Sequence, residues 1–526
     1  MKDSNKRTSS VRSEDGNDKL VLVVIAVLGA ACFVGAAWAF TASAPEPYMD
    51  EVFHVPMTEA YCKRDYGRWD PKITTPPGLY VSALAYAHLA STIKLVLLWA
   101  TGTGIQLEED HDGKLWWCAE TVLRQTNWVF SLGTLAVMRA LLWRRMPPGK
   151  AWAHAILLWL YPVSFFFSFL LYTDTGATFF FLLCYLLATG RPSGGSWGRR
   201  IGSAAAGGIA IVFRQTNAVW VAFALAVCLL EDFAPHVNIT ATATFATTST
   251  DKKNDDVVIS TSSPTRGRHK IPTVVQLVWR LIRAALRDAF RGAPLLRTRL
   301  PLAVPVLLFA VFVWGFNGGA IALGDKENHS PGGPPHLAQL AYFVAVCASL
   351  WGFVGKDSAF GREAQAGAFA RARRMGFFAC LSAVCAVAFG LWRYSLAHPF
   401  LLSDNRHYTF YIWRRLLKRP VLRSALAPAY IFCGWLVSSR LLERKNILWV
   451  LTFAGATAVV VVPSPLLEPR YLTVPVLLAH LESRERTWLS LLVGVAACVL
   501  VNAGIIFVFL FRPFAWHDGS VARFMW

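Results

Sequence analysis

The chain has 526 residues, of which 55% are hydrophobic and 16% are charged, with 21 Trp and 35 Phe. This balance excludes an ordinary soluble enzyme and is typical of an all-α polytopic membrane protein. The formal net charge of +20 does not indicate nucleic-acid binding, because the basic residues lie mostly in short loops between apolar runs, where membrane orientation explains them.

Residues 1–19 are polar and basic and are predicted to form a cytosolic tail. The apolar run 20–42 is predicted as the first transmembrane span. A cleaved signal peptide would have a shorter apolar core, so we expect this span to be retained with its basic end in the cytosol. The loop 43–75, which opens with PEPYMDEVFHVP at 45–56, then lies on the lumenal side.

Two blocks of apolar runs follow this loop. Residues 76–230 are predicted as the first transmembrane region, with spans near 76–100, 116–142, 150–171, 172–189 and 201–230. Residues 231–299 are predicted as a cytosolic linker, disordered over the Thr- and Ser-rich stretch 236–270. Residues 300–526 form the second region, with lumenal loops at 324–336, 398–412 and 464–470. The total is about 13 spans, within a range of about 11–14, counting about 20 apolar residues for each.

Three basic loops test this order of spans. Loop 355–374 reads as cytosolic, in agreement with the preference of Lys and Arg for that side. Loops 143–150 and 191–200 are also basic, yet simple alternation places both in the lumen. One boundary among the early spans is therefore expected to be misplaced.

The cysteines and two intramembrane arginines receive structural interpretations. Most of the ten cysteines, such as Cys184 and Cys498, sit inside apolar runs, so we predict no metal or disulfide framework. The tetrapeptide RQTN occurs twice, and it places Arg124 and Arg214 within apolar runs. A charge at that depth normally faces a polar interior, and a structural bond to a neighbouring helix is the simpler interpretation.

Four polar clusters border the spans, at 46–77, 324–336, 398–411 and 463–471, and the span count places all four on one membrane face. Their candidate functional residues are Asp50, Glu51, Lys326, His329, Arg406, His407 and Arg470. A carboxylate can take a proton from an acceptor hydroxyl, while cations stabilise a departing phosphate. Phosphate leaves as a stable anion and needs no separate general acid. The combination predicts transfer of a sugar from a lipid phosphate.

Longer motifs make the chain similar to a known family. PYMDEVFHVPMTEAYC, WDPKITTPPGLY, FRQTNAVW, NGGAIALGDKENH, HPFLLSDNRHYTFYIWRR, EPRY and the terminal RFMW resemble the dolichyl-phosphoglucose-dependent alpha-1,2-glucosyltransferases. The resemblance runs in order from residue 47 to 526, apart from the linker.

The resemblance implies a multi-pass GT-C-type glycosyltransferase of the endoplasmic reticulum membrane with its active site facing the lumen. The donor would be dolichyl phosphate glucose, and the acceptor a diglucosylated high-mannose oligosaccharide on dolichyl diphosphate. The reaction would be the last step of lipid-linked oligosaccharide assembly for N-glycosylation. A beta donor linkage and an alpha product would make it a single inverting displacement.

Residue roles follow as hypotheses. The base would be Asp50, with Glu51 as second choice, and we expect no metal or other cofactor. The donor phosphate would meet Lys326, His329, Arg406, His407 and Arg470. The sugar or acceptor site would include His54, Trp69 and Lys72. Two alternatives stay open on the residues alone, namely a dolichyl-phosphomannose-dependent mannosyltransferase and a polytopic transporter or channel.

Overall fold

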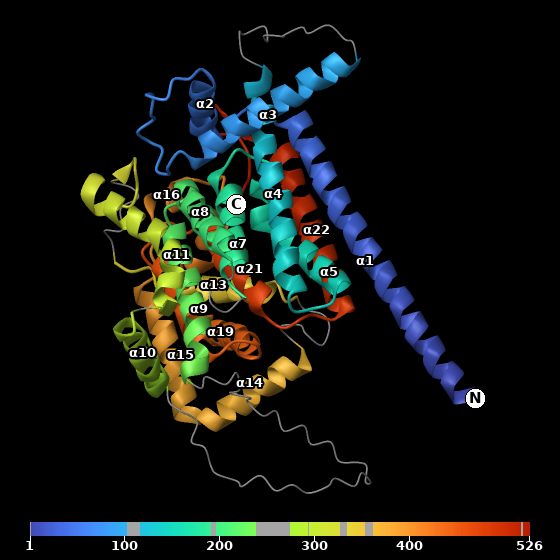
Figure 1. Cartoon of the computed structure of the whole chain (residues 1–526), viewed down its shortest axis with the longest axis vertical. Helices are drawn as coiled ribbons and strands as arrows, with labels where there is room; N and C mark the ends of the chain where they lie inside the picture. Colours follow the sequence, from blue (N-terminus) through green and yellow to red (C-terminus); the bar gives the residue numbers. More distant parts are fainter. Residues whose placement is uncertain are drawn as a thin grey trace, which may run out of the picture.

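A computed structural model describes residues 2–101, 116–190, 196–237, 274–292, 294–326, 334–352, 361–516 and 519–526. These residues form a helical bundle (Figure 1). We call the end at which α2 lies in Figure 1 the upper end and the end at which α14 lies the lower end. The helices of the first half are α1 (Lys2–Ser43), α2 (Glu51–Cys62), α3 (Gly78–Thr101), η1 (Trp116–Cys118), α4 (Glu120–Trp143), α5 (Pro148–Trp159), α6 (Pro162–Phe167), α7 (Thr173–Ala188), α8 (Trp197–Phe213) and α9 (Asn217–Val237).

The second half continues the bundle and ends in a short hairpin. Its elements are α10 (Val274–Phe290), α11 (Pro294–Val311), η3 (Phe312–Phe316), α13 (Ala338–Ser349), α14 (Arg362–Met375), α15 (Phe377–Arg393), α16 (Pro399–Ser403), α17 (Tyr408–Ile412), η4 (Trp413–Leu417), α18 (Pro420–Ala425), α19 (Ala427–Leu442), α20 (Ile447–Val461), η5 (Pro469–Leu472), α21 (Thr473–Glu482), α22 (Trp488–Phe511), β1 (Phe514–Ala515) and β2 (Val521–Ala522). The strands pair antiparallel, with Phe514 opposite Ala522. The last helix packs beside the first.

The number of long apolar helices shows that the chain is an all-α polytopic membrane protein. Within the described residues, six helices are long and apolar enough to cross a membrane, or seven if the bent pair α14–α15 is one span. Three shorter apolar helices, α7, α13 and α20, accompany them. This number is lower than the 13 spans expected, because several apolar runs are broken into short helices. The run 150–171, for example, ends α5 at Trp159 and restarts at Pro162, a residue that cannot continue the preceding helix.

The α3 helix has the length and hydropathy of a span but lies across the upper end of the bundle (Figure 1). The Tyr86 hydroxyl donates to Gln125 Oε1 in the second turn of α4 at 2.8 Å. Further along α3, Lys94 Nζ lies 4.0 Å from the ring centroid of Trp116, just before α4. Two positions on α3 that are more than two turns apart thus both contact the start of α4, so α3 does not run down beside it.

The run 201–230, expected as one span, is two helices with a turn between them. Helix α8 ends at Phe213 and α9 begins at Asn217, and Arg214 in the turn pairs with Asp174 at the start of α7. The basic segment after α4 lies at the other end of the bundle, where the Arg144 guanidinium donates to the carbonyl of Thr189 at the end of α7 at 3.0 Å. The Arg199 guanidinium donates to the carbonyls of Leu186 and Leu187, also near the end of α7. The residues 144–150 and 196–200 therefore lie at the lower end.

A disulfide joins Cys62 at the end of α2 to Cys118 in η1. The prediction that the cysteines form no disulfide was wrong for these two residues. They lie outside the apolar cores of the spans, and their separation of 56 residues gave no recognisable spacing pattern. The bond ties the two ends of the segment that carries α3 to each other.

We expect Cys62→Ser/Cys118→Ser protein to lose about 2–4 kcal/mol of stability, because the bond restricts a long loop in the unfolded chain. Thermal unfolding in detergent, with and without reductant, measures this loss. The variant Cys385→Ser, which removes an exposed free thiol, is the control and should behave as wild type. An unchanged melting temperature on reduction of wild-type protein would contradict the expectation.

Most of the predicted linker 236–270 lies outside the described residues. The flanking part of 231–299 is helical, with α9 extending to Val237 and α10 occupying Val274–Phe290. Helix α10 packs on α9 through Ala284 and Phe233. The lower end therefore includes an ordered amphipathic helix within the predicted linker.

Candidate active site

A cavity of about 530 Å³ opens at the upper end of the bundle. Residues from all four polar clusters line it, together with the end of the chain. The polar lining residues are Asp50, His54, Lys72, Thr74, Thr75, Tyr172, Thr173, Arg214, Asp325, Asp404, His407, Thr409, Glu468, Arg470 and Tyr471. The apolar wall includes Phe53, Phe167, Phe400, Leu466, Met525 and Trp526.

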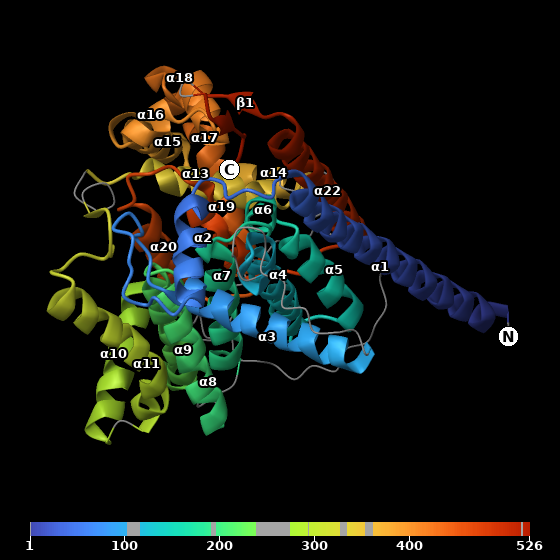
Figure 2. The same ribbon diagram turned by 90° about the horizontal axis from the view of Figure 1, so that it is seen from above.

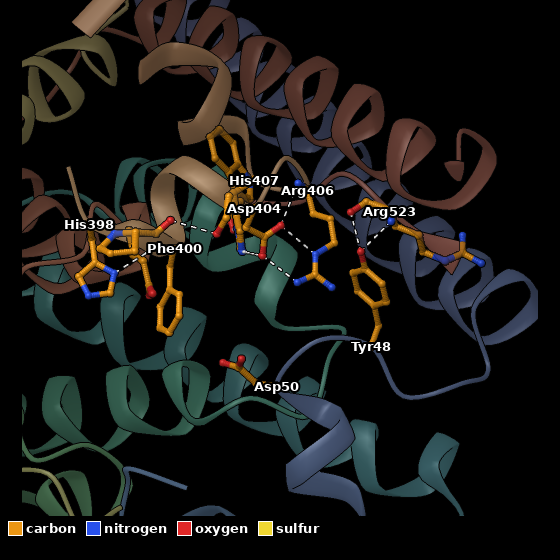
Figure 3. Close-up of polar contacts among 12 residues, drawn as sticks. Tyr48, Asp50, His398, Phe400, Asp404, Arg406, His407 and Arg523 are labelled. Atoms are coloured by element: carbon orange, nitrogen blue, oxygen red, sulfur yellow. Dashed lines mark hydrogen bonds and ion pairs between the residues drawn. The ribbon is translucent and has the colours of Figure 1, made fainter. Parts of the chain in front are cut away.

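Asp50 presents its carboxylate to this cavity, pointing toward the segment that holds Asp404 and His407 (Figure 3). It occupies the N-cap position of α2 without a capping hydrogen bond from its side chain, and its backbone N–H donates to the Tyr172 hydroxyl at 3.1 Å. The preceding residue, Met49, has a left-handed backbone with φ of 57°, which a side chain tolerates only when the surroundings fix it. The chain is thus bent sharply where the carboxylate enters the cavity.

Arg470 in η5 is the direct partner of Asp50. Its Nη1 lies 2.9 Å from Asp50 Oδ2 and 3.8 Å from Asp174 Oδ2, and its Nε pairs with Glu468. Burial acts to raise the pKa of the Asp50 carboxyl, but the Arg470 guanidinium outweighs it and holds that pKa below its usual range. Asp50 is therefore a carboxylate at neutral pH.

Glu51 faces the opposite way, into the protein. It is 0% exposed, whereas the side chain of Asp50 is 38% exposed. Glu51 Oε1 accepts from Arg124 Nε at 2.8 Å and from the backbone N–H of Leu171 at 2.6 Å, and Oε2 accepts from Arg124 Nη2 at 2.6 Å. The pair joins α2 to α4, so the structure assigns Glu51 a bonding role in the protein core.

The two RQTN arginines have related surroundings. Arg124 pairs with Glu51 inside the protein, as the simpler interpretation expected. Arg214 pairs with Asp174 but also lines the cavity. It therefore belongs to the candidate site as well as to the core.

The three predicted sugar-site residues occupy two layers. His54 lines the cavity, and its Nδ1 is 2.8 Å from the Tyr80 hydroxyl. Burial lowers the pKa of His54 to about 4, although Asp50 opposes the shift, so the ring is neutral at pH 7. Trp69 packs behind it, edge-on to Tyr80. Lys72 lines the cavity from an exposed position, with its Nζ 5.4 Å from the ring centroid of Phe53.

Some of the predicted phosphate ligands line the cavity and others do not. His407 lines the cavity as Arg470 does, and its Nδ1 is 2.7 Å from the carbonyl oxygen of Trp526. Arg406 instead forms a bidentate ion pair with Asp404 and stacks on Trp516 at 3.9 Å (Figure 3). Lys326 Nζ contacts Asn317 Oδ1 at 2.9 Å. His329 lies outside the described residues.

Comparison with known proteins places this geometry in a family. Residues 44–481 match the DIE2/ALG10 family, a range that includes both Asp50 and Arg470. The chain belongs to the DIE2/ALG10 family. Several curated relatives carry the name Dol-P-Glc:Glc(2)Man(9)GlcNAc(2)-PP-Dol alpha-1,2-glucosyltransferase. The Arabidopsis thaliana protein is 33% identical over 513 residues, covering 92% of this chain and 95% of the relative. The Mus musculus protein is 30% identical, with 93% and 95% covered, and the Debaryomyces hansenii protein is 29% identical, with 97% and 100% covered. No solved structure matches the chain.

The C-terminal residues of this DIE2/ALG10 family member complete the cavity wall. Met525 N donates to the carbonyl of Arg406, and Tyr408 N donates to the carbonyl of Met525, so the last residues pair with the third polar cluster. The Tyr48 hydroxyl accepts from Arg523 N at 2.6 Å and donates to Arg523 O at 2.8 Å (Figure 3). The sequence signalled this segment only as the motif RFMW, without a role.

Several cavity carboxylates were also missed from the sequence of this family member. Asp174 stands in the apolar stretch 172–189, where an acidic residue was itself a signal of a polar interior. Asp325, Asp404 and Glu468 each sit one or two residues from a predicted cation. The structure brings all four near the cavity, where each balances a neighbouring positive charge or lines the wall.

Proposed function

We propose that this protein transfers glucose from dolichyl phosphate glucose, in alpha-1,2 linkage, to a diglucosylated high-mannose oligosaccharide on dolichyl diphosphate. The observation that carries the proposal is the contact between Asp50 and Arg470 in one cavity, in a chain whose relatives bear the name of this reaction. A carboxylate facing a guanidinium provides a proton acceptor beside a phosphate ligand, which this transfer requires.

The proposed reaction is one inverting displacement. Asp50 takes the proton of the acceptor hydroxyl as its oxygen bonds to C1 of glucose, and the bond from C1 to the donor phosphate oxygen breaks. The electron pair leaves with dolichyl phosphate, which needs no proton to depart as a stable anion. Glu51 takes no part, because both its oxygens are engaged by Arg124 and Leu171.

Arg470, His407 and Lys72 are the proposed donor-phosphate ligands. Arg470 already pairs with Asp50 and Glu468, so a bound phosphate shares its guanidinium with these carboxylates. Withdrawal of Arg470 toward the phosphate weakens its hold on Asp50 and makes that carboxylate a stronger base. Lys72 is exposed at the cavity with its ammonium against the Phe53 ring, and is free to turn toward the ligand.

We further propose that the upper end faces the lumen of the endoplasmic reticulum in a GT-C architecture of about 13 crossings, counted at about 20 apolar residues each. The Cys62–Cys118 bond at this end supports an oxidising compartment. With α3 lying across the bundle, the basic residues 144–150 and 196–200 at the lower end fall in the cytosol, as the positive-inside preference favours.

Purified protein in liposomes tests the function. We expect glucose transfer from synthetic dolichyl phosphate glucose to the diglucosylated acceptor, and cells lacking the protein should accumulate the acceptor one glucose short of complete. Transfer from dolichyl phosphate mannose instead would establish the mannosyltransferase alternative. Solute uptake without any transfer would establish the transporter alternative.

The acid side of the pH profile gives a separate expectation. Because Arg470 holds the pKa of Asp50 below its usual range, the base stays ionised, and kcat/KM should be level from about pH 7 down to about pH 5. The rate should fall only at lower pH, as Asp50 becomes protonated. In Arg470→Gln protein, burial meets less opposition, so the pKa of Asp50 should rise and the acid limb of the residual activity should move to higher pH. An unmoved limb would show that another group titrates.

A further inference from the structure

A cluster of exposed cations lies next to the active site but outside it. Arg414, Arg415, Lys418 and Arg419 are all exposed within six residues of η4 and the turn after it. Within the described ranges none of the four pairs with a carboxylate, and Arg414 lies 5.9 Å from the Phe410 ring centroid. A hollow of about 560 Å³ is lined by three of these cations together with Pro420, Val421 and Leu422.

The cluster lies at the upper end of the bundle. His407 lines the active-site cavity, and α17 with η4 runs from there to Leu417. Ten helical residues rise about 15 Å, which is too little to cross a bilayer core of about 30 Å. The next helix returns to the end of α15, where Arg423 Nη2 donates to the carbonyl of Trp392 at 2.7 Å. Figure 2 shows α16, α17 and α18 grouped together.

The local structure anchors the backbone segment that carries these cations. Trp413 and Leu417 are buried and fix one side of η4 in a small apolar cluster. The cations occupy the other side, and the segment is a π-helix, a form often found at functional sites. Val421 beside them is 79% exposed and faces outward. The hollow therefore combines positive charge on an anchored backbone segment with an apolar surface suited to a lipid chain.

Four neighbouring cations repel one another, and Lys and Arg are disfavoured on the lumenal side of a membrane protein. Such a group is stabilised when an anion with several charges binds it. Arg and Lys side chains suit phosphate oxygens in particular. The proposed donor phosphate already has Arg470 in the cavity, so the cluster fits a second phosphate-bearing lipid.

We propose that Arg414, Lys418 and Arg419 bind the diphosphate of the lipid-linked acceptor. This inference rests on the proposed function and on the proposed lumenal orientation of the upper end. The apolar chain of the acceptor lies against Val421 and Leu422, and its oligosaccharide extends from the hollow toward Asp50. The enzyme thus recognises the lipid diphosphate at a place separate from the reacting sugar.

The test compares two acceptors in the triple variant Arg414→Gln/Lys418→Gln/Arg419→Gln. With the lipid-linked acceptor we expect KM to rise about ten-fold or more, as three charge-assisted contacts are lost, with kcat and the donor KM unchanged. With the same oligosaccharide released from its lipid diphosphate, wild type and variant should perform alike. An unchanged KM for the lipid-linked acceptor, or an equal loss with both acceptors, would overturn the proposal.

A matched control removes the same charge elsewhere. Arg280→Gln/Arg283→Gln/Arg287→Gln changes three exposed arginines on α10, and it should leave both acceptors unaffected. Both assays are repeated in neutral and in anionic lipid nanodiscs. A defect of the Arg414→Gln/Lys418→Gln/Arg419→Gln protein, called the η4 variant because its changes lie in and just after η4, that appears only in anionic nanodiscs would show that the cluster binds bulk lipid. That result would overturn the proposal.

A binding measurement separates this inference from the proposed reaction. Farnesyl diphosphate should raise the melting temperature of wild-type protein and should have a weaker effect on the η4 variant, whether or not glucose transfer is detected. Absence of transfer with this difference intact would reject the proposed function alone. Equal stabilisation of both proteins would reject the diphosphate site.

Discussion

Asp50→Asn protein is expected to lose glucosyl transfer by about 10²–10⁴-fold, the usual contribution of a positioned general base. Asn keeps the size of the side chain but cannot take the acceptor proton. The fold should persist, because the Asp50 side chain is 38% exposed in the cavity and its ion-pair partner Arg470 keeps a second carboxylate, Glu468. Single-turnover transfer from synthetic donor to synthetic acceptor measures the effect.

The control for this variant is Asp65→Asn, which removes an exposed carboxylate from the same loop and should turn over normally. Thermal unfolding of Asp50→Asn should match that of wild type. Near-normal transfer by Asp50→Asn protein would reject Asp50 as the base, whatever the family assignment.

Glu51→Ala is expected to act on stability, at a cost of about 1–3 kcal/mol, because the buried Arg124 guanidinium loses its bidentate carboxylate partner and keeps Glu120 as its carboxylate partner. The Leu171 N–H also loses its acceptor. We expect lower yield and a lower melting temperature, measured by intrinsic tryptophan fluorescence in detergent. Arg124→Met should show the same direction of change, since it leaves the carboxylate alone.

The double variant Glu51→Leu/Arg124→Met gives the decisive comparison. Removing both charges leaves neither member of the Glu51–Arg124 pair buried without the other, so this protein should be more stable than either single variant and should recover part of its transfer activity. A fully folded but inactive Glu51→Gln protein would show instead that Glu51 takes part in the chemistry.

The sequence identified the acidic pair but did not separate the roles of its members. Successive residues on a helix point about 100° apart, so one of two adjacent carboxylates at the start of α2 faces the cavity and the other faces α4. Which one does so depends on the left-handed turn at Met49 and on the position of Arg124. Both are set by contacts distant in the sequence.

The span order shows a second limit of sequence reasoning. Hydropathy reports the length of an apolar run but not its direction. Helix α3 has the length and hydropathy of a crossing, yet it lies across the upper end of the bundle. The run 201–230, predicted as one span, is two helices, α8 and α9, with a turn at Arg214. Under the proposed orientation, in which α3 is not a crossing, these two differences cancel after residue 230. The later polar clusters then stay on the same face as Asp50, while residues 144–150 and 196–200 move to the cytosolic side.

The phosphate ligands were the least predictable part of the site. Their place in polar clusters at the ends of predicted spans identified Arg470 and His407, and both residues line the cavity. The same criterion identified Lys326 and Arg406, whose side chains turn to Asn317 and Asp404. A shift of one residue decides between the two outcomes, and the loop conformations that set it arise from tertiary contacts.

The pairing of Tyr48 with Arg523 has a consequence for biosynthesis. Met525 and Trp526 follow all of the described membrane helices in the chain, yet they line the same cavity as the base. The pocket is therefore incomplete while only the helices have been synthesised and inserted.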